Sequence, residues 1–297
     1  MLVTERMRKM RLKHSTPADT SITAREPAKW VRLGARLGYL AKGAVYVLIA
    51  FLAARAAWIG GSASGPREVL WTVVEQPIGM VLLAGVAIGL SAYSLWRFTQ
   101  CIADTEGCGR SFRGLCARAG YFGSGLVYGG LVLLAARILT GVAQRRQQPG
   151  DVYVREWTRA LMQQPWGQWL VGTVGIGVIV FGLAQLYKTW TGIFRDEGDL
   201  SGMSARRRRR AVWFGRFGAA GRGVVFAIIG VWLIVAAKNA DPADARGLGG
   251  ALDTLALQPY GPWLLGAAAG GFFAYGLYQF TLAGYKPQVK RSCERPV

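Results

Sequence analysis

The sequence predicts an all-α integral membrane protein in which six transmembrane helices form three parallel helical-hairpin repeats. Three observations support this: the apolar residues fall into six long runs, a Gln-Pro-x-Gly tetrad recurs ahead of every second run, and basic residues crowd into alternate connections. Of the 297 residues, 52% are hydrophobic and only 18% are charged. Because charged residues make up about a quarter of a soluble domain, the composition favours a membrane protein.

The six apolar runs occupy residues 39–58, 78–98, 119–139, 168–190, 217–237 and 262–283. A helix of about 20 residues, rising about 1.5 Å per residue, crosses a hydrocarbon core of about 30 Å. Each run reaches this length, and none contains Asp or Glu. We therefore expect six transmembrane helices.

The basic residues predict the orientation of these helices. Residues 1–29 are polar and basic and lack the apolar stretch of a signal peptide, so we interpret them as a disordered cytosolic tail. With six spans, the two tails and the second and fourth connections share one side and hold 23 Lys and Arg, against 7 in the other three connections. The positive-inside rule then predicts a multi-pass protein of the cytoplasmic membrane with both termini in the cytosol.

The tetrads divide the chain into three copies of one unit. We expect repeat 1 at residues 30–104, repeat 2 at 105–194, a basic cytosolic linker at 195–210, repeat 3 at 211–285 and a cytosolic tail at 286–297. Each repeat holds two spans, so all three insert in the same orientation. Such repeats suggest a bundle with a pseudo-threefold axis along the membrane normal, although a linear row is the alternative. The repeated tetrads are Gln76-Pro77-Ile78-Gly79, Gln164-Pro165-Trp166-Gly167 and Gln258-Pro259-Tyr260-Gly261.

Aligning the tetrads brings further positions into register. The second spans share a glycine, an aromatic residue and a polar donor: Gly89, Tyr93 and Arg97; Gly177, Phe181 and Gln185; Gly271, Tyr275 and Gln279. The first spans share an Arg-x-Gly motif and later a glycine: Arg36, Gly38 and Gly43; Arg118, Gly120 and Gly125; Arg216, Gly218 and Gly223. Small residues on one helix face allow close helix packing in lipid, and we expect the recurring glycines to serve that purpose.

A short amphipathic stretch precedes each tetrad. Ahead of Pro77, for example, Val69, Leu70, Val73 and Val74 lie at helical spacing on one face. We expect each stretch to form a short interfacial helix with its apolar face in lipid. The helix should end at the residue before proline, and proline should begin the next span at its first position. The tetrad is thus predicted to be a corner between an interfacial helix and a span.

These motifs resemble a known family. The order Arg-x-Gly-Tyr, small-rich span, amphipathic stretch, Gln-Pro-x-Gly, then Gly-x3-Tyr-x3-Arg/Gln is similar to the bacterial membrane repeat of domain-of-unknown-function family 1206. The resemblance covers about residues 30–285 and implies tandem two-span units, commonly three. It departs at Ala219 in the third copy and at Thr173 in the second, and it implies no activity.

One layer of polar donors is a candidate site. Arg97, Gln185 and Gln279 end the second spans on the cytosolic side, and Arg36, Arg118 and Arg216 precede the first spans at similar depth. A ring of such donors can bind an anion or a lipid headgroup, because the guanidinium matches phosphate. The alternative is snorkelling side chains and helix-to-helix hydrogen bonds. Lys42 and Arg222 share one aligned position, where the second copy has Ser124, and we expect them to reach the headgroups.

A run of five arginines lies between the second and third copies: Arg206, Arg207, Arg208, Arg209 and Arg210. We expect this segment to be unfolded and to contact anionic lipid through charge, at about 1 kcal/mol for each residue. The alternatives are topology fixing and an acidic protein partner.

The chain shows no pattern for catalysis, a cofactor, a metal or nucleic-acid binding. Cys101, Cys108, Cys116 and Cys293 fall on the cytosolic side at spacings that match no zinc site, and the single histidine is His14. The spans have no acidic residue of the kind that coupled transporters use. We therefore expect a non-enzymatic structural, interaction or lipid-associated protein, with a passive channel or carrier along the pseudo-threefold axis as the alternative.

Overall fold

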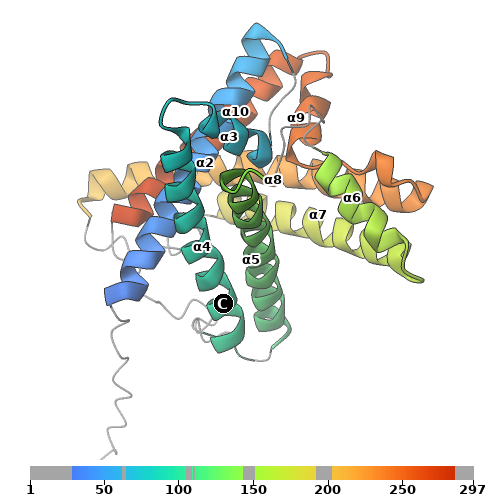
Figure 1. Cartoon of the computed structure of the whole chain (residues 1–297), viewed down its shortest axis with the longest axis horizontal. Helices are drawn as coiled ribbons and strands as arrows, with labels where there is room; N and C mark the ends of the chain where they lie inside the picture. Colours follow the sequence, from blue (N-terminus) through green and yellow to red (C-terminus); the bar gives the residue numbers. More distant parts are fainter. Residues whose placement is uncertain are drawn as a thin grey trace, which may run out of the picture.

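The computed structural model of the chain describes residues 29–61, 65–104, 109, 111–142, 151–191 and 203–284. These residues form long helices joined by short helices and turns (Figure 1). Residues 1–28 of the predicted N-terminal tail, the predicted C-terminal tail, half of the predicted linker, Cys108 and Cys293 lie outside the described residues. In the part that is described, every predicted span is helical.

The long helices match the predicted spans and extend beyond them. They are α2 (Lys29–Ile59), α4 (Gly79–Ala103), α5 (Phe112–Leu139), α7 (Gly167–Thr191), α8 (Ala205–Asn239) and α10 (Gly261–Gly284). All except α10 are long and apolar enough to cross a membrane. Helix α10, with 24 residues, is the shortest of the six, and it packs between α2 and α8. A helix covered by its neighbours can carry polar groups such as Gln279 without exposing them to lipid.

The long helices associate in three pairs, each of which joins two copies. Helix α4 packs against α5, α7 against α8, and α10 against α2. Each pair joins the second long helix of one copy to the first long helix of the next, and the pair of α10 with α2 connects the third copy back to the first. Each copy therefore contacts the other two, which a linear row of three copies would not allow, although no interface between α5 and α7 closes the ring of helices.

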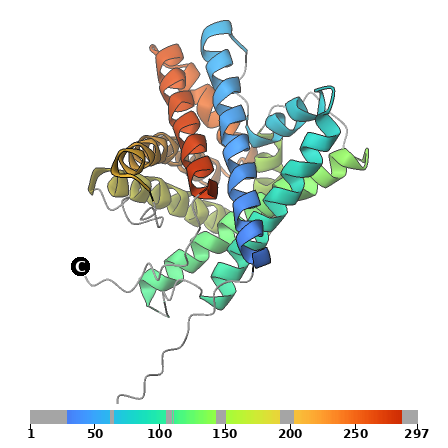
Figure 2. The ribbon, with the colours of Figure 1, turned by 90° about the vertical axis from the view of Figure 1, so that its left-hand side faces the viewer.

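The pairs do not stand parallel to one another. The pair α7·α8 runs across the pair α4·α5 (Figure 1), while α2 and α10 lie side by side (Figure 2). This differs from the upright bundle that we expected from parallel repeats. Glycines at several helix contacts allow the backbones to approach closely.

The same contact builds all three pairs. Ser94 Oγ donates to the carbonyl oxygen of Gly125 over 2.8 Å in the pair α4·α5. The aligned position in the second copy is Gly182, where an added Cβ would lie 2.6 Å from the carbonyl oxygen of Gly223. In the third copy, a Cβ added to Gly276 would lie 3.0 Å from the carbonyl oxygen of Gly43. The recurring glycines thus form the contacts between copies.

Within a copy the two long helices meet only in the first and third copies. A Cβ on Gly38 of α2 would lie 2.9 Å from Tyr93 of α4, and a Cβ on Gly218 of α8 would lie 2.6 Å from Tyr275 of α10. In the second copy, the aligned Gly120 of α5 has no atom of α7 or of any other element within 4 Å of such a Cβ. Helices α5 and α7 form no substantial interface, so the second hairpin is open.

The short helices before the tetrads are α3 (Pro66–Val74), α6 (Val152–Met162) and α9 (Leu248–Ala256), and a 3-10 turn, η2 (Pro242–Asp244), precedes α9. The helices were predicted, but their expected contact with lipid is wrong for α3 and α9. Val69 and Leu70 of α3 and Leu252 of α9 are fully buried in the protein core. An apolar helix face can be removed from water by packing against other helices as well as by contact with lipid. Here the neighbouring long helices cover the apolar faces of α3 and α9.

Each tetrad is a β-turn. The backbone N–H of Gly79 donates to the carbonyl oxygen of Gln76 over 2.8 Å, and the aligned bonds at Gly167 and Gly261 measure 2.9 and 2.8 Å. The next helix begins at glycine, so our expectation that proline occupies its first position is wrong; proline is the second residue of the turn, which it also favours. A Cβ on Gly167 would collide with the carbonyl oxygen of Leu161, so the tetrad requires glycine there.

Candidate functional site: a buried cluster of cations and tyrosines

The predicted layer of donors does not assemble into one ring. Arg118 Nε donates to the carbonyl oxygen of Cys101 at 2.7 Å, and Arg216 Nε donates to that of Thr189 at 2.9 Å. Both arginines therefore bind the unpaired carbonyls at the end of the preceding copy's second long helix, a site that favours cations. Arg36 is exposed. Arg118 and Arg216 thus link one copy to the next.

The other three predicted donors have different surroundings. Gln185 is half-buried on α7, whereas Gln279 on α10 is 2% exposed. Arg97 on α4 binds inward: its Nε and Nη2 donate to the hydroxyl of Tyr93 at 2.9 and 2.6 Å, and its Nη1 donates to Gln100 Oε1 at 3.0 Å. Of the six, Arg97 belongs to the central cluster described next, and Gln279 lies one turn beyond one of its tyrosines.

Lys42 lies at the centre of this cluster. Its ammonium group donates to the hydroxyl of Tyr93 at 2.8 Å and sits 4.7 to 5.5 Å from the ring centres of Tyr93, Tyr128 and Tyr275. Lys42 is 4% exposed, so the expectation that it reaches the headgroups is wrong. Cation–π contact with three rings explains how α2 holds a charge in the core.

Arg222 of α8 is the second buried cation for which we expected the headgroup region. It is 7% exposed, and its guanidinium carbon lies 4.1 Å from the ring centre of Tyr275 and 5.2 Å from that of Tyr46. Lys42 and Arg222 therefore contact the same ring, Tyr275. The tyrosines also pack in pairs: the ring centres are 4.8 Å apart for Tyr46 with Tyr275 and for Tyr93 with Tyr128.

We call this group the cation–tyrosine cluster; its members are Lys42, Arg97, Arg222, Tyr46, Tyr93, Tyr128 and Tyr275. They come from α2, α4, α5, α8 and α10, so all three copies contribute. The sequence carried a signal for it: a cation recurs at one aligned position in the first and third copies, and tyrosine recurs at another. We missed it because the distance of these positions from the span ends suggested snorkelling, and spacing along a helix does not tell which face its neighbours cover.

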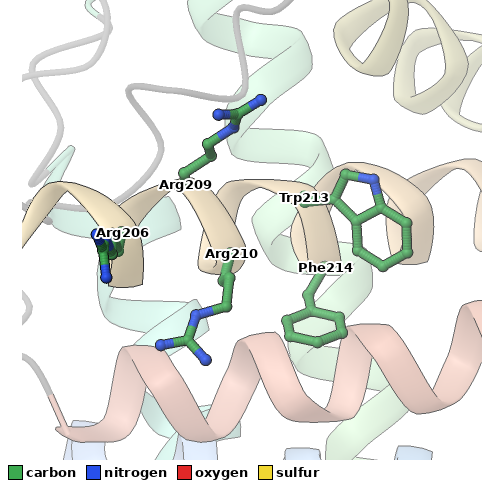
Figure 3. Close-up of a pocket in the computed structure, with 5 residues that line it drawn as sticks. All are labelled: Arg206, Arg209, Arg210, Trp213 and Phe214. Atoms are coloured by element: carbon green, nitrogen blue, oxygen red, sulfur yellow. The ribbon is translucent and has the colours of Figure 1, made fainter.

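A second basic site lies at the start of α8. Arg206, Arg209, Arg210, Trp213 and Phe214 line an open pocket of about 540 Å³ (Figure 3). Arg210 and Phe214 point toward the neighbouring α10, and Arg209 points to the opposite side (Figure 3). All five arginines of the run are helical because α8 begins at Ala205. The expectation of an unfolded segment is therefore wrong: Ser204 precedes the helix at a position that serine favours, and the helix continues unbroken into the apolar segment.

Comparison with known proteins identifies the family. The family described as Domain of Unknown Function (DUF1206) matches three times, at residues 37–104, 119–192 and 217–286. The chain is also similar to the uncharacterized protein YxxB of Bacillus subtilis (strain 168), with 38% identity over 261 residues, which cover 88% of this chain and 93% of the relative. No solved structure matches the chain. The protein thus belongs to the DUF1206 family, with three tandem copies of its repeat.

Proposed function

We propose that the protein is a non-enzymatic, lipid-associated structural protein of the cytoplasmic membrane that holds anionic headgroups at the start of α8. The observation that carries this proposal is the pocket lined by Arg206, Arg209 and Arg210 beside Trp213 and Phe214. Guanidinium groups bind phosphate by paired hydrogen bonds, and tryptophan favours the boundary between headgroups and acyl chains. A headgroup with its attached chains fits both halves of this surface.

The length of α8 supports a position at the membrane surface. Its 35 residues extend about 52 Å at 1.5 Å per residue, well beyond a hydrocarbon core of about 30 Å. The arginines occupy the end that would project, and the unpaired N–H groups of the first turn add positive potential there. Trp213 stacks on Phe217 at 5.6 Å, and both rings are exposed. Exposed aromatic rings next to arginines favour lipid over an acidic protein surface as the partner.

The packing of the centre favours a structural role over the alternative of a passive channel or carrier. The rings of Tyr93 and Phe272 and the side chains of Ile49, Val225 and Leu265 are each at most 1% exposed. These residues belong to one apolar cluster built from α2, α4, α8 and α10. This packing of side chains among α2, α4, α8 and α10 supports a structural role over a solute path between these helices.

The proposal includes an orientation of the protein in the membrane. Both termini lie in the cytosol, so the start of α8 faces the cytosolic leaflet. A reporter that is active only outside the cytosol should give signal when fused after Gly150 and none when fused after Gly198. The reverse pattern would contradict the orientation, and the α8 pocket would then face the other leaflet.

The lipid proposal can be tested with the full chain in nanodiscs that contain phosphatidylglycerol or only phosphatidylcholine. Crosslinking from a photoactivatable anionic lipid to the start of α8 should fall at least fivefold in Arg209→Gln/Arg210→Gln, because both pocket arginines are lost. The matched control is Arg207→Gln/Arg208→Gln, which removes the same charge from residues that do not line the pocket. Equal loss in both variants would indicate attraction by net charge alone and would overturn the pocket as a site.

A further inference from the structure

The cation–tyrosine cluster carries three positive side chains and no negative one. Helices α2, α4, α5, α7, α8 and α10 contain no Asp or Glu, so no carboxylate within the long helices balances Lys42, Arg97 and Arg222. Tyrosine rings and hydroxyls lower the cost of these charges without cancelling them. Buried cations in proteins are normally paired with an anion, and the described long helices supply no carboxylate for this purpose.

Arg222 also has an unsatisfied donor. Its Nε–H is buried and has no hydrogen-bond partner, although the whole side chain is only 7% exposed. A buried donor without a partner is costly, and more so when it is charged. The guanidinium carbon lies 5.2, 5.2 and 4.1 Å from the ring centres of Tyr46, Phe226 and Tyr275, and these ring contacts give Nε–H no hydrogen-bond acceptor. Nε–H is thus a charged donor for which the described residues provide no acceptor.

Gln279 provides a second unsatisfied group close along α10. It lies one turn beyond Tyr275, it is 2% exposed, and its Oε1 has no partner. Its amide carries both donors and an acceptor, so it can bind an anion through N–H or a protonated oxygen through Oε1. A ligand that presents charged oxygens together with a hydroxyl satisfies both Arg222 and Gln279. Phosphate-type oxyanions have this combination, whereas a halide does not.

From these observations we infer that the cation–tyrosine cluster is a binding site for a phosphate-type oxyanion, with the Arg222 Nε–H as a direct donor and Lys42 and Arg97 supplying balancing charge. The same chemistry comes either from a free inorganic ion or from the headgroup of an anionic lipid. This site is separate from the α8 pocket, which lies on the protein surface.

The test uses the purified full chain in a neutral detergent and follows its thermal unfolding at constant ionic strength. Sodium phosphate, phosphatidylglycerol and sodium chloride are titrated separately. We expect phosphate, phosphatidylglycerol or both to raise Tm by several degrees, because a ligand that binds only the folded state stabilises it; chloride should have no comparable effect. A response to phosphate identifies a free ion as ligand, and a response to phosphatidylglycerol alone identifies a headgroup.

Arg222→Gln should weaken the apparent affinity at least tenfold, since a charged hydrogen bond is lost. Arg222→Lys keeps the charge and the residue type of the aligned Lys42, which provides a second variant if glutamine prevents folding; it should lose affinity because it lacks Nε–H. Lys238→Gln, an exposed change of equal charge on the same helix, should bind as the wild type does. All phosphatidylglycerol titrations are repeated in Arg209→Gln/Arg210→Gln to remove the surface pocket.

Two results would overturn the inference. One is a Tm that responds to chloride as strongly as to phosphate, because that indicates screening of charge. The other is an unchanged affinity in both Arg222 variants.

Discussion

The second hairpin of this protein is open, whereas the first and third are closed. The difference lies within the copies, because the contacts between copies are the same in all three: Ser94 with Gly125, Gly182 with Gly223 and Gly276 with Gly43. Small residues face each other at the closed hairpins, Gly89 against Ala41 and Gly271 against Gly221. The second copy has small residues at the corresponding positions, Gly123 and Gly177, and neither touches another element. Small residues are therefore not sufficient to close a hairpin.

What the second copy lacks is a polar pair across the hairpin. In the first copy Lys42 of α2 donates to Tyr93 of α4, and in the third copy Arg222 of α8 stacks on Tyr275 of α10. The aligned residues of the second copy are Ser124 and Phe181, which have neither the charge nor the hydroxyl. Polar contacts between helices in lipid are specific because the alternative is an unsatisfied group. The closed hairpins thus differ from the open one by a cation and a tyrosine across the interface, and we expect this pair to close the hairpin for which the glycines only make room.

The largest expected effect comes from filling the closed interface. Gly89→Leu and Gly271→Leu should each lower the free energy of unfolding by about 3 kcal/mol, because overpacking forces the helices apart; a Cβ alone already lies 2.5 Å from Ala41 and 3.1 Å from Gly221. Gly177→Leu, the aligned change in the open hairpin, should cost less than about 1 kcal/mol. Unfolding of the detergent-solubilised chain measures all three. An equal cost at Gly177 would show that the second hairpin is closed in solution.

Removing the tyrosine hydroxyl should open the first hairpin. Tyr93→Phe reproduces the second copy's Phe181 and leaves Lys42 and Arg97 without their shared acceptor, so we expect a loss of about 2 kcal/mol. The free energy of unfolding measures it, and Tyr187→Phe, on the exposed Tyr187 of α7, serves as the control. If Tyr93→Phe were as stable as the control, the polar pair would not be what holds α2 to α4.

The converse change should close the second hairpin. Ser124→Lys with Phe181→Tyr supplies the missing pair and should shift the open-to-closed equilibrium by about 1 kcal/mol, or about fivefold. Crosslinking between Gly123→Cys and Gly177→Cys by a short thiol reagent reports closure, in a background where all four native cysteines are serine. Gly123→Cys with Leu183→Cys, whose second position lies on another face of α7, controls for random collision.

Each single substitution should increase this crosslinking less than the pair does. An increase that is the same for Phe181→Tyr alone would mean that the lysine takes no part, and no increase with the pair would mean that another feature keeps α5 and α7 apart.

The smallest effect is expected at the Gln-Pro-x-Gly turns, whose hydrogen bonds are nearly the same length in the open and the closed hairpins. Pro77→Ala, Pro165→Ala and Pro259→Ala should each cost about 0.5 kcal/mol, since alanine loses only the preset backbone angle of the turn. Thermal unfolding compares the three directly. A much larger loss at Pro165 than at the other two would tie the corner to the open state of the second hairpin.

Much of this fold follows from the sequence alone. The sequence displays directly the spacing that sets the helix positions, the three copies, the short helices before each tetrad and a corner at each Gln-Pro-x-Gly, although not that this corner is a β-turn. The recurrence of glycines such as Gly43, Gly125 and Gly223 also predicted close packing. Local periodicity and turn chemistry act between residues that are near neighbours in the chain, so three aligned copies make them clear.

Only the tertiary structure decided which faces meet. It joined α10 to α2, left α5 and α7 apart, covered the apolar faces of α3 and α9 with protein, and buried Lys42 and Arg222 among tyrosines. The residues that matter, such as Lys42 and Tyr93, are 51 positions apart. A cation near the end of an apolar run has the same sequence pattern whether its side chain extends to the headgroups or into the core. The outcome depends on whether aromatic rings from other helices lie close enough to bind it, and that is a property of the assembled helices.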